Sequence, residues 1–403
     1  MELFWLEHKK LWRKKIVKIC VLLCFVYYVI FGSILSFQWF SFGSSDDYTS
    51  AFGNNFDGYT VIKDSQEYAL SFGGELTDET LQQIVSDYQQ MEADGMEEEL
   101  EKTDWQIVNS WLGTLYPELR DTSNYKTMIS YVDPDKLTGF YERRQQVLDE
   151  FLEVSGQVGA EKEFLHQIER KVEKPFRYEW VEGWSTLLGS MVADLGVVMA
   201  LFLGIVLSSL FAGEWHDNTS TLVLTTRNGW GKIALAKILT GLAFTVELFA
   251  LLAVSSVISQ LFFMGTAGWD MPIQNIKLIA VAPMNMLQAE IYEYAFVLLG
   301  AIGFAGIVMF ISAAVKNNVL TLLLSLAVVY GPMMIAEYLP YGMQKALDLI
   351  PLVGSSTDIF RTNTFRILGK LIWSPYLLIT IPVLIGILCM PFAIKSWSRR
   401  MKA

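Results

Sequence analysis

The chain is poor in the residues that build disulfide frameworks and metal centres. Its 403 residues include only three cysteines, and all three lie in apolar runs, so no disulfide framework is expected in an exposed part. The three histidines are far apart and lack the H-E-x-x-H spacing of zinc proteases. Glu214 and His216 have no further ligand nearby in the sequence, and we expect a solvated pair with no metal site. The remaining residues of these two types are Cys20, Cys24, Cys389, His8 and His166.

The sequence also lacks a phosphate-binding loop. That loop needs a glycine, four residues and then Gly-Lys-Ser/Thr. Gly231-Lys232 is followed by Ile233, and Thr226 stands where the first glycine is required. We therefore expect no cofactor in this chain. Its net charge of −11 gives no reason to expect a nucleic-acid partner.

Apolar sequence, in contrast, is abundant. The composition is 52% hydrophobic with a mean hydropathy of +0.34, which is too apolar for a soluble acidic enzyme. Residues 19–40 carry no charge and are long enough to cross about 30 Å of hydrocarbon. The sequence predicts an all-α polytopic membrane protein with six transmembrane helices. The other five expected spans are 186–213, 238–263, 294–315, 319–336 and 371–394.

The charges are distributed unevenly along the chain. Residues 41–183 hold 12 Lys/Arg and 30 Asp/Glu, whereas the two termini, the 214–237 bridge and the short 316–318 turn together hold 14 Lys/Arg and 4 Asp/Glu. Basic residues next to membrane spans stay in the cytoplasm. We therefore expect both termini to be cytoplasmic and 41–183 to form an acidic extracytoplasmic domain between spans one and two.

The bridge between spans two and three, residues 214–237, is a short polar stretch. Before it, span two carries a small residue at every fourth position, which lets membrane helices approach closely. After it, Lys232 and Lys237 precede the next apolar run, as in a helix that re-enters lipid from the basic side. We expect a cytoplasmic hairpin. The small residues proposed for helix packing are Gly196, Ala200, Gly204 and Ser208.

The hairpin has a distinctive order of residues: a Glu that closes a membrane helix, a Thr-containing turn, a Leu-rich half-helix and K-I-x-L-x-K. The residues concerned are Glu214, Thr219, Leu222, Leu224, Thr225, Thr226, Lys232, Ile233, Leu235 and Lys237. This stretch resembles the permease subunits of ABC type-2 exporters. It departs from them at Asn218, where glycine is common, and at Arg227, where proline is common.

The resemblance implies that a separate cytoplasmic ABC ATPase subunit, which binds ATP and Mg, touches this hairpin. The residues it implicates in ATPase coupling are Glu214, Thr219, Arg227, Lys232 and Lys237. It also implies a second permease copy or a paralogue. Under this hypothesis Glu214→Ala and Arg227→Ala uncouple transport while the protein stays folded.

Residues 1–18 alternate apolar side chains with Lys and Arg, which predicts an amphipathic helix on the inner leaflet. It either anchors the chain or also contacts the ATPase, and the sequence leaves both open. In the outer domain we expect a short strand at 58–62 and four helices near 77–91, 105–115, 140–152 and 164–172. The stretches GGELTDE and PFRYEWVEGW resemble inserts in permeases of Gram-positive bacteria, which implies a plasma-membrane location there.

Two carboxylates fall within expected spans, Asp194 in the outer third of span two and Glu247 near the middle of span three. A carboxylate in hydrocarbon costs roughly 2.5–3.5 kcal/mol on insertion scales, so both are pathway candidates. The alternative is a protonated side chain bonded to a neighbouring helix. The loop 264–292 is expected to carry little chemistry, and the glycines of span four are expected to serve packing. By resemblance, 338–370 forms a re-entrant pair of short helices.

These features together predict the permease subunit of an ATP-driven exporter for an amphipathic peptide, antibiotic or lipid. Two rivals remain. One is a mechanotransducing or sensing protein that uses ATP to move its outer domain, and such proteins usually have four spans. The other is an intramembrane enzyme, for which Asp194 and Glu247 are the only candidate polar residues at membrane depth in the sequence.

Overall fold

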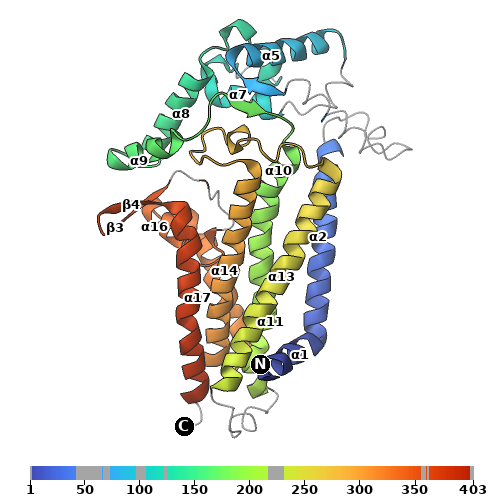
Figure 1. The fold of residues 1–403 in the computed structure, drawn as a ribbon, viewed down its shortest axis with the longest axis vertical. Coiled ribbons are helices and arrows are strands. Elements are labelled where there is room, and N and C mark those ends of the chain that lie inside the picture. Colours follow the sequence, from blue (N-terminus) through green and yellow to red (C-terminus); the bar gives the residue numbers. More distant parts are fainter. Residues whose placement is uncertain are drawn as a thin grey trace, which may run out of the picture.

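The computed structural model describes residues 2–41, 66, 73–96, 106–121, 126–216, 231–354, 360 and 363–399. It is a long helical bundle with a smaller, mostly helical domain at one end (Figure 1). The N-terminal helix and the last turn of the C-terminal helix lie together at the opposite end (Figure 1).

Within the described residues, five helical stretches are long and apolar enough to cross a membrane, so the chain is a multi-pass membrane protein. The first, Glu182–His216, consists of α10 (Glu182–Thr186), a π-helical turn (Leu187–Met191) and α11 (Val192–His216). The second and third are α13 (Lys232–Met264) and α14 (Met286–Ala314). The fourth, Asn318–Tyr338, consists of α15 (Asn318–Ile335) and a 3₁₀ turn, and the fifth, Ser374–Ser398, lies within α17 (Ser374–Arg399). The expected first span corresponds to α2 (Lys15–Ser41), which packs beside α13.

The predicted start of the fourth span is wrong by two turns. We expected it at Tyr294, whereas α14 begins at Met286. Asn285 caps the helix, since its side chain accepts a hydrogen bond from the Gln288 backbone while the Gln288 side chain accepts one from the Asn285 backbone. The first turns of α14 therefore contain Glu290, which fell in the expected loop 264–292, and Glu293, which lay just before the expected span.

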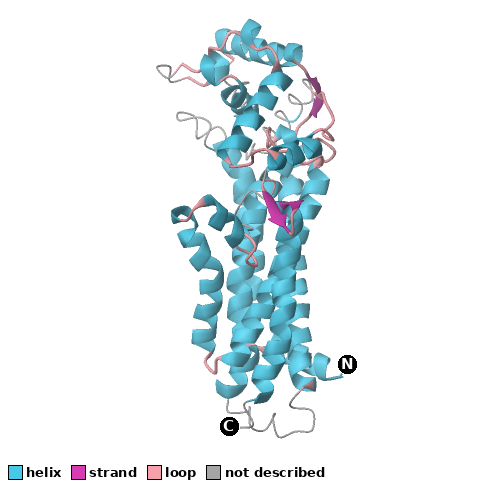
Figure 2. Cartoon of the chain, turned by 90° about the vertical axis from the view of Figure 1, so that its left-hand side faces the viewer, coloured by secondary structure: helices cyan, strands magenta, loops and turns pink. Residues whose placement is uncertain are grey.

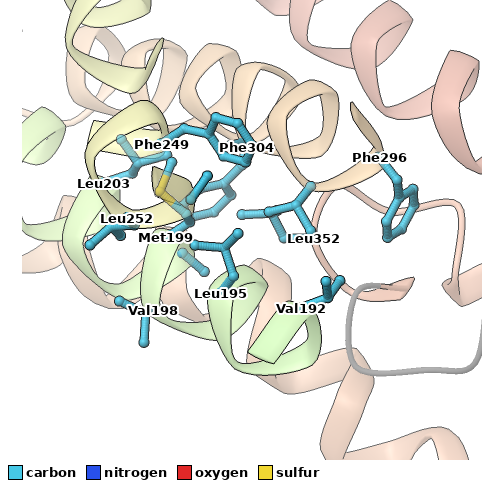
Figure 3. Packing of buried hydrophobic residues seen from close by; sticks show 14 of the residues in the cluster. Val192, Leu195, Val198, Met199, Leu203, Phe249, Leu252, Phe296, Phe304 and Leu352 are labelled. Atoms are coloured by element: carbon cyan, nitrogen blue, oxygen red, sulfur yellow. The ribbon is translucent and has the colours of Figure 1, made fainter. Parts of the chain in front are cut away.

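Close contact between α14 and α17 forms the tightest part of the bundle. A Cβ added to Gly306 would lie 2.5 Å from the backbone oxygen of Gly386, and one added to Gly303 would lie 2.2 Å from that of Pro382. The glycines of this span therefore do serve packing. Apolar side chains of α11, α13 and α14 interdigitate in the middle of the bundle, where Leu352 joins them from a loop (Figure 3).

The domain at the end of the bundle opposite α1, called the outer domain after its expected placement, contains the four helices expected from the periodicity. They are α5 (Asp78–Ala93), α7 (Gln106–Leu115), α8 (Phe140–Val154) and α9 (Ala160–Glu169). Thr77 caps α5 by accepting a hydrogen bond from the backbone of Thr80, as its sequence predicts. The strands β1 (Gly74–Leu76) and β2 (Phe176–Tyr178) pair antiparallel where the chain enters and leaves this domain. The expected strand at 58–62 lies outside the described residues.

The stretch expected to form two short helices is built differently in its described part. One helix, α16 (Tyr341–Leu347), is followed by the antiparallel hairpin β3 (Thr364–Ile367) and β4 (Lys370–Trp373), visible below the outer domain in Figure 2. Leu368 and Gly369 form its turn with positive φ angles of 49° and 79°. Leucine rarely adopts this conformation, so the sequence carries little signal for the turn.

Candidate functional site

Three elements meet at the end of the bundle opposite the outer domain. The helix α1 (Glu2–Arg13) crosses α13 (Figure 1), and the last turn of α11 approaches both. The amphipathic pattern of residues 1–18 thus gives a separate helix that ends at Arg13, with its one fully buried apolar side chain, Leu11, packed into the bundle. This junction brings together several residues that the sequence had singled out.

A buried ion network joins the three elements. The Lys237 ammonium on α13 lies 2.8 Å from the Glu214 carboxylate of α11 and 2.8 Å from the Glu7 carboxylate of α1. Lys10 of α1 adds a second contact of 2.6 Å to Glu214. The side chains of Glu214 and Lys237 are 3% and 2% exposed. Because burial strips both groups of water, each depends on the other for compensation of its charge.

Next to this network, the Lys14 ammonium donates a hydrogen bond of 2.9 Å to Ser209 of α11. A cavity of about 20 Å³, room for one water molecule, lies between α1, α11 and α13. The amino-terminal helix is therefore fastened to two transmembrane helices by ion pairs and hydrogen bonds, in addition to apolar packing.

Glu247 also contacts α1. Its carboxylate lies 3.1 Å from His8 and accepts a hydrogen bond of 3.0 Å from the Trp12 indole. With 33 residues, α13 is about 50 Å long at 1.5 Å per residue, well beyond the hydrocarbon thickness. Glu247 is near the middle of this helix, and its contacts with His8 and Trp12 place it beside α1 with a side chain that is 43% exposed.

Asp194 is bound elsewhere. One of its oxygens accepts a hydrogen bond of 3.0 Å from Tyr27 of α2, and the other is buried without a hydrogen-bond partner among the described residues. The two pathway candidates thus contact different elements and do not form one site.

The small-residue ladder lies inside the bundle, with all four members buried. Gly204 faces α15, where a Cβ added to it would lie 3.2 Å from the Leu326 side chain and 3.3 Å from that of Leu322. The backbone oxygen of Ser208 accepts a hydrogen bond of 2.7 Å from Ser312 of α14. The ladder therefore serves contacts with two neighbouring helices.

The remaining residues implicated in ATPase coupling are not all described. Lys232 is exposed at the start of α13, while Thr219 and Arg227 lie outside the described residues.

The segment between α13 and α14, expected to carry little chemistry, accepts hydrogen bonds from side chains of the outer domain. Arg144 of α8 is fully buried and donates hydrogen bonds of 2.7 Å and 3.1 Å to the backbone oxygens of Leu278 and Ala280. The Trp111 indole donates one of 3.1 Å to Asn275. These are tertiary contacts to backbone atoms, and no pattern in the sequence predicts such contacts.

Arg144 is compensated by Glu169, 2.6 Å away, which also pairs with Lys174 at 2.8 Å. Burial raises the pKa of Glu169, but the hydrogen bonds from Lys174 and Arg144 outweigh it and hold the pKa below its ordinary value.

Glu290 and Glu293 are buried carboxyl residues that sequence reasoning missed. Their side chains lie inside the bundle near the start of α14, 3% and 2% exposed. The Asn285-x-x-Gln288 capping box was a readable signal that a helix begins before them. No protein-family model, curated protein or solved structure matches the chain.

Proposed function

We propose that the chain is the permease subunit of an ATP-driven exporter in the plasma membrane of a Gram-positive bacterium. It works with a cytoplasmic ABC ATPase, which binds ATP and Mg, and with a second permease copy or a paralogue. In this proposal α2 also crosses the membrane, which brings the number of spans to six, and both termini are cytoplasmic. The cargo is an amphipathic peptide, antibiotic or lipid.

The observation that carries this proposal is the ion network of Glu7, Glu214 and Lys237. It ties both ends of the 214–237 hairpin to α1, so a force on the hairpin acts on α1, α11 and α13 together. Closure of the ATPase pair then rocks these helices between inward- and outward-open states. Thr219, Arg227 and Lys232 contact the ATPase, whereas the buried Glu214 and Lys237 hold the hairpin in position.

A groove of about 610 Å³ suits the apolar part of such a cargo. It lies between α2 and α13 and is lined mainly by apolar side chains, among them Phe25, Val254 and Phe262. An amphipathic molecule in the membrane has access to a lateral groove of this kind.

The first experiment is a pull-down of the tagged permease from its native membrane in mild detergent, with identification and ATPase assay of co-purifying proteins. We expect a stoichiometric ATPase. Arg227→Ala should keep the protein folded and lower cargo-stimulated ATPase activity. Glu214→Ala is a less clean test, because it also leaves Lys237 buried without its main partner. A permease that copurifies with no ATPase would refute the exporter proposal.

A second candidate is an ATP-driven transducer that moves its outer domain. The contacts that favour it are those of Arg144 with the α13–α14 connection and the ion pair of 2.6 Å between Arg366 in β3 and Glu161 in α9. Through them a displacement of the bundle would reach the outer domain. A complex whose ATPase activity depends on the outer domain but never moves cargo would favour this candidate.

A further inference from the structure

The outer half of the bundle contains a buried carboxyl group that neither proposed function uses. Glu290 lies in the second turn of α14, 3% exposed. One turn further along, the Tyr294 hydroxyl makes a hydrogen bond of 2.7 Å with Ser256 of α13. Glu290 therefore lies one turn from a polar contact that joins α13 and α14 inside the bundle.

Among the described residues, Glu290 has no cation to compensate a negative charge. Neither of its carboxyl oxygens has a hydrogen-bond partner within the described residues. The Tyr294 hydroxyl is close enough to interact with the carboxyl group, although not in good hydrogen-bond geometry, and no Lys, Arg or His of the described residues does so. An ionised carboxylate without a partner costs several kcal/mol when it is taken out of water, and the neutral acid avoids this cost.

On α13 the site lies well inside the helix. The Trp180 and Trp184 indoles donate hydrogen bonds to the backbone of Met264, the last residue of α13, and of Ala267 just beyond it. Ser256 precedes Met264 by eight residues, which is about 12 Å of helix. Water reaches this depth only if α13 and α14 separate at their outer ends.

We propose that Glu290 binds a proton in this closed arrangement of the bundle and releases it to water when α13 and α14 separate. The carboxyl O–H bond breaks, the proton passes to a water molecule, and the carboxylate is then stabilised by hydration. High pH therefore favours separation, and low pH favours the closed bundle. The proposal does not depend on the exporter assignment.

Other titratable groups nearby are few. On α14 they are Glu293 and Tyr294, and Tyr28 of α2 interacts with Tyr294 and Asp194. On α13 the adjacent polar side chains, Ser256 and Gln260, do not titrate. Glu293 makes contacts of its own, so Glu290 and Glu293 are not equivalent.

Infrared spectroscopy of the full chain in lipid nanodiscs tests the proposal directly. A protonated carboxyl has a C=O stretch separate from the carboxylate and amide bands. At pH 7 an ordinary Asp or Glu, with a pKa of about 4, is less than about 1% protonated. We expect wild type to show this band at pH 7, Glu290→Gln to lose it, and the matched control Glu293→Gln, equally buried on the same helix, to keep it.

Three outcomes would overturn the assignment: no band in wild type, a band unchanged in Glu290→Gln, or a band lost only in Glu293→Gln. If Glu290→Gln does not fold, Glu290→Asp should shift the band without abolishing it.

A second measurement follows thermal unfolding from pH 5 to pH 9. Unfolding lets Glu290 ionise in water, so wild type should lose stability relative to Glu290→Gln as pH rises. A difference that stays constant with pH would contradict the proposal.

Discussion

At the scale of single residues, Lys237 is the cation on which the junction of α1, α11 and α13 depends. Lys237→Met removes the buried cation from the Glu214 carboxylate, which keeps its contact with the half-exposed Lys10. The same change removes the cation from Glu7. Removal of one partner from a buried ion pair costs about 3–5 kcal/mol. We expect a clear fall in the thermal midpoint in detergent, followed with a thiol-reactive dye, because Cys20 and Cys24 are buried in α2.

Lys10→Met is the matched control, since it removes a cation from the same carboxylate. The Lys10 side chain is 52% exposed, so its ion pair contributes at most about 1 kcal/mol. The double variant Glu214→Gln/Lys237→Met should recover part of the loss, because the buried Glu214 carboxylate is removed together with its cation, while Glu7 still lacks Lys237. Equal effects of Lys237→Met and Lys10→Met would contradict the buried network.

The Arg144–Glu169–Lys174 cluster predicts how the outer domain responds to acid. The pKa of Glu169 is lower in the folded protein than in the unfolded chain, so its stabilising contribution is complete above about pH 4.3 and is lost as pH falls through the lower folded value. Wild type should therefore lose stability in acid more steeply than Glu169→Gln, measured by circular dichroism during thermal unfolding. Glu163 forms an exposed pair with Arg170, so Glu163→Gln should show the same dependence of stability on pH as wild type.

At the scale of elements, the α14–α17 contact depends on glycine. In Gly306→Ala the new Cβ would meet the Gly386 backbone, which cannot move aside as a flexible side chain can. Overpacking of this kind costs about 1–3 kcal/mol. Gly331 of α15 has no atom within 4 Å of an added Cβ, so Gly331→Ala should be neutral or stabilising by up to about 1 kcal/mol. Comparison of the two thermal midpoints checks this, and a similar fall in both would contradict it.

Local signals in the sequence predicted most helices well. Thr77 before an apolar period marked the start of α5, and Asn317 begins α15 as a cap after the predicted turn. The exception is α14, whose span was expected to start at Tyr294, eight residues after the helix begins at Met286. The helix starts after the capping residue Asn285, so the hydrogen bonds of the capping box predict this boundary better than the average hydropathy does.

Contacts between distant parts of the chain could not be predicted in the same way. The hairpin residues Glu214 and Lys237 were recognised, but their partner Glu7 was not, because nothing in residues 1–18 distinguishes Glu7 from a solvated acid. Arg144 likewise looks like an ordinary helix-surface residue until the backbone of 278–280 is brought onto it. Such pairs depend on tertiary packing, which periodicity and composition do not encode.

At the scale of the whole molecule, the two ends of the bundle differ in construction. One end holds α1 and the Glu7–Glu214–Lys237 network, and the other holds the outer domain on the α13–α14 connection (Figure 1). In the described part of the chain, five helical stretches that are long and apolar enough to cross a membrane connect these ends. If α2 is the sixth span, the two ends face opposite sides of the membrane and both termini face the same side.

Labelling of single cysteines in intact Gram-positive cells tests this arrangement. In a Cys389→Ser background, in which Cys20 and Cys24 stay buried, Val154→Cys places a thiol on the outer domain at a position that is 89% exposed. Trp5→Cys places one on α1 at a position that is 62% exposed. We expect a membrane-impermeant maleimide to label Val154→Cys in intact cells and Trp5→Cys only after lysis. Labelling of both in intact cells would mean that α2 does not cross the membrane, and labelling of Trp5→Cys alone would reverse the orientation.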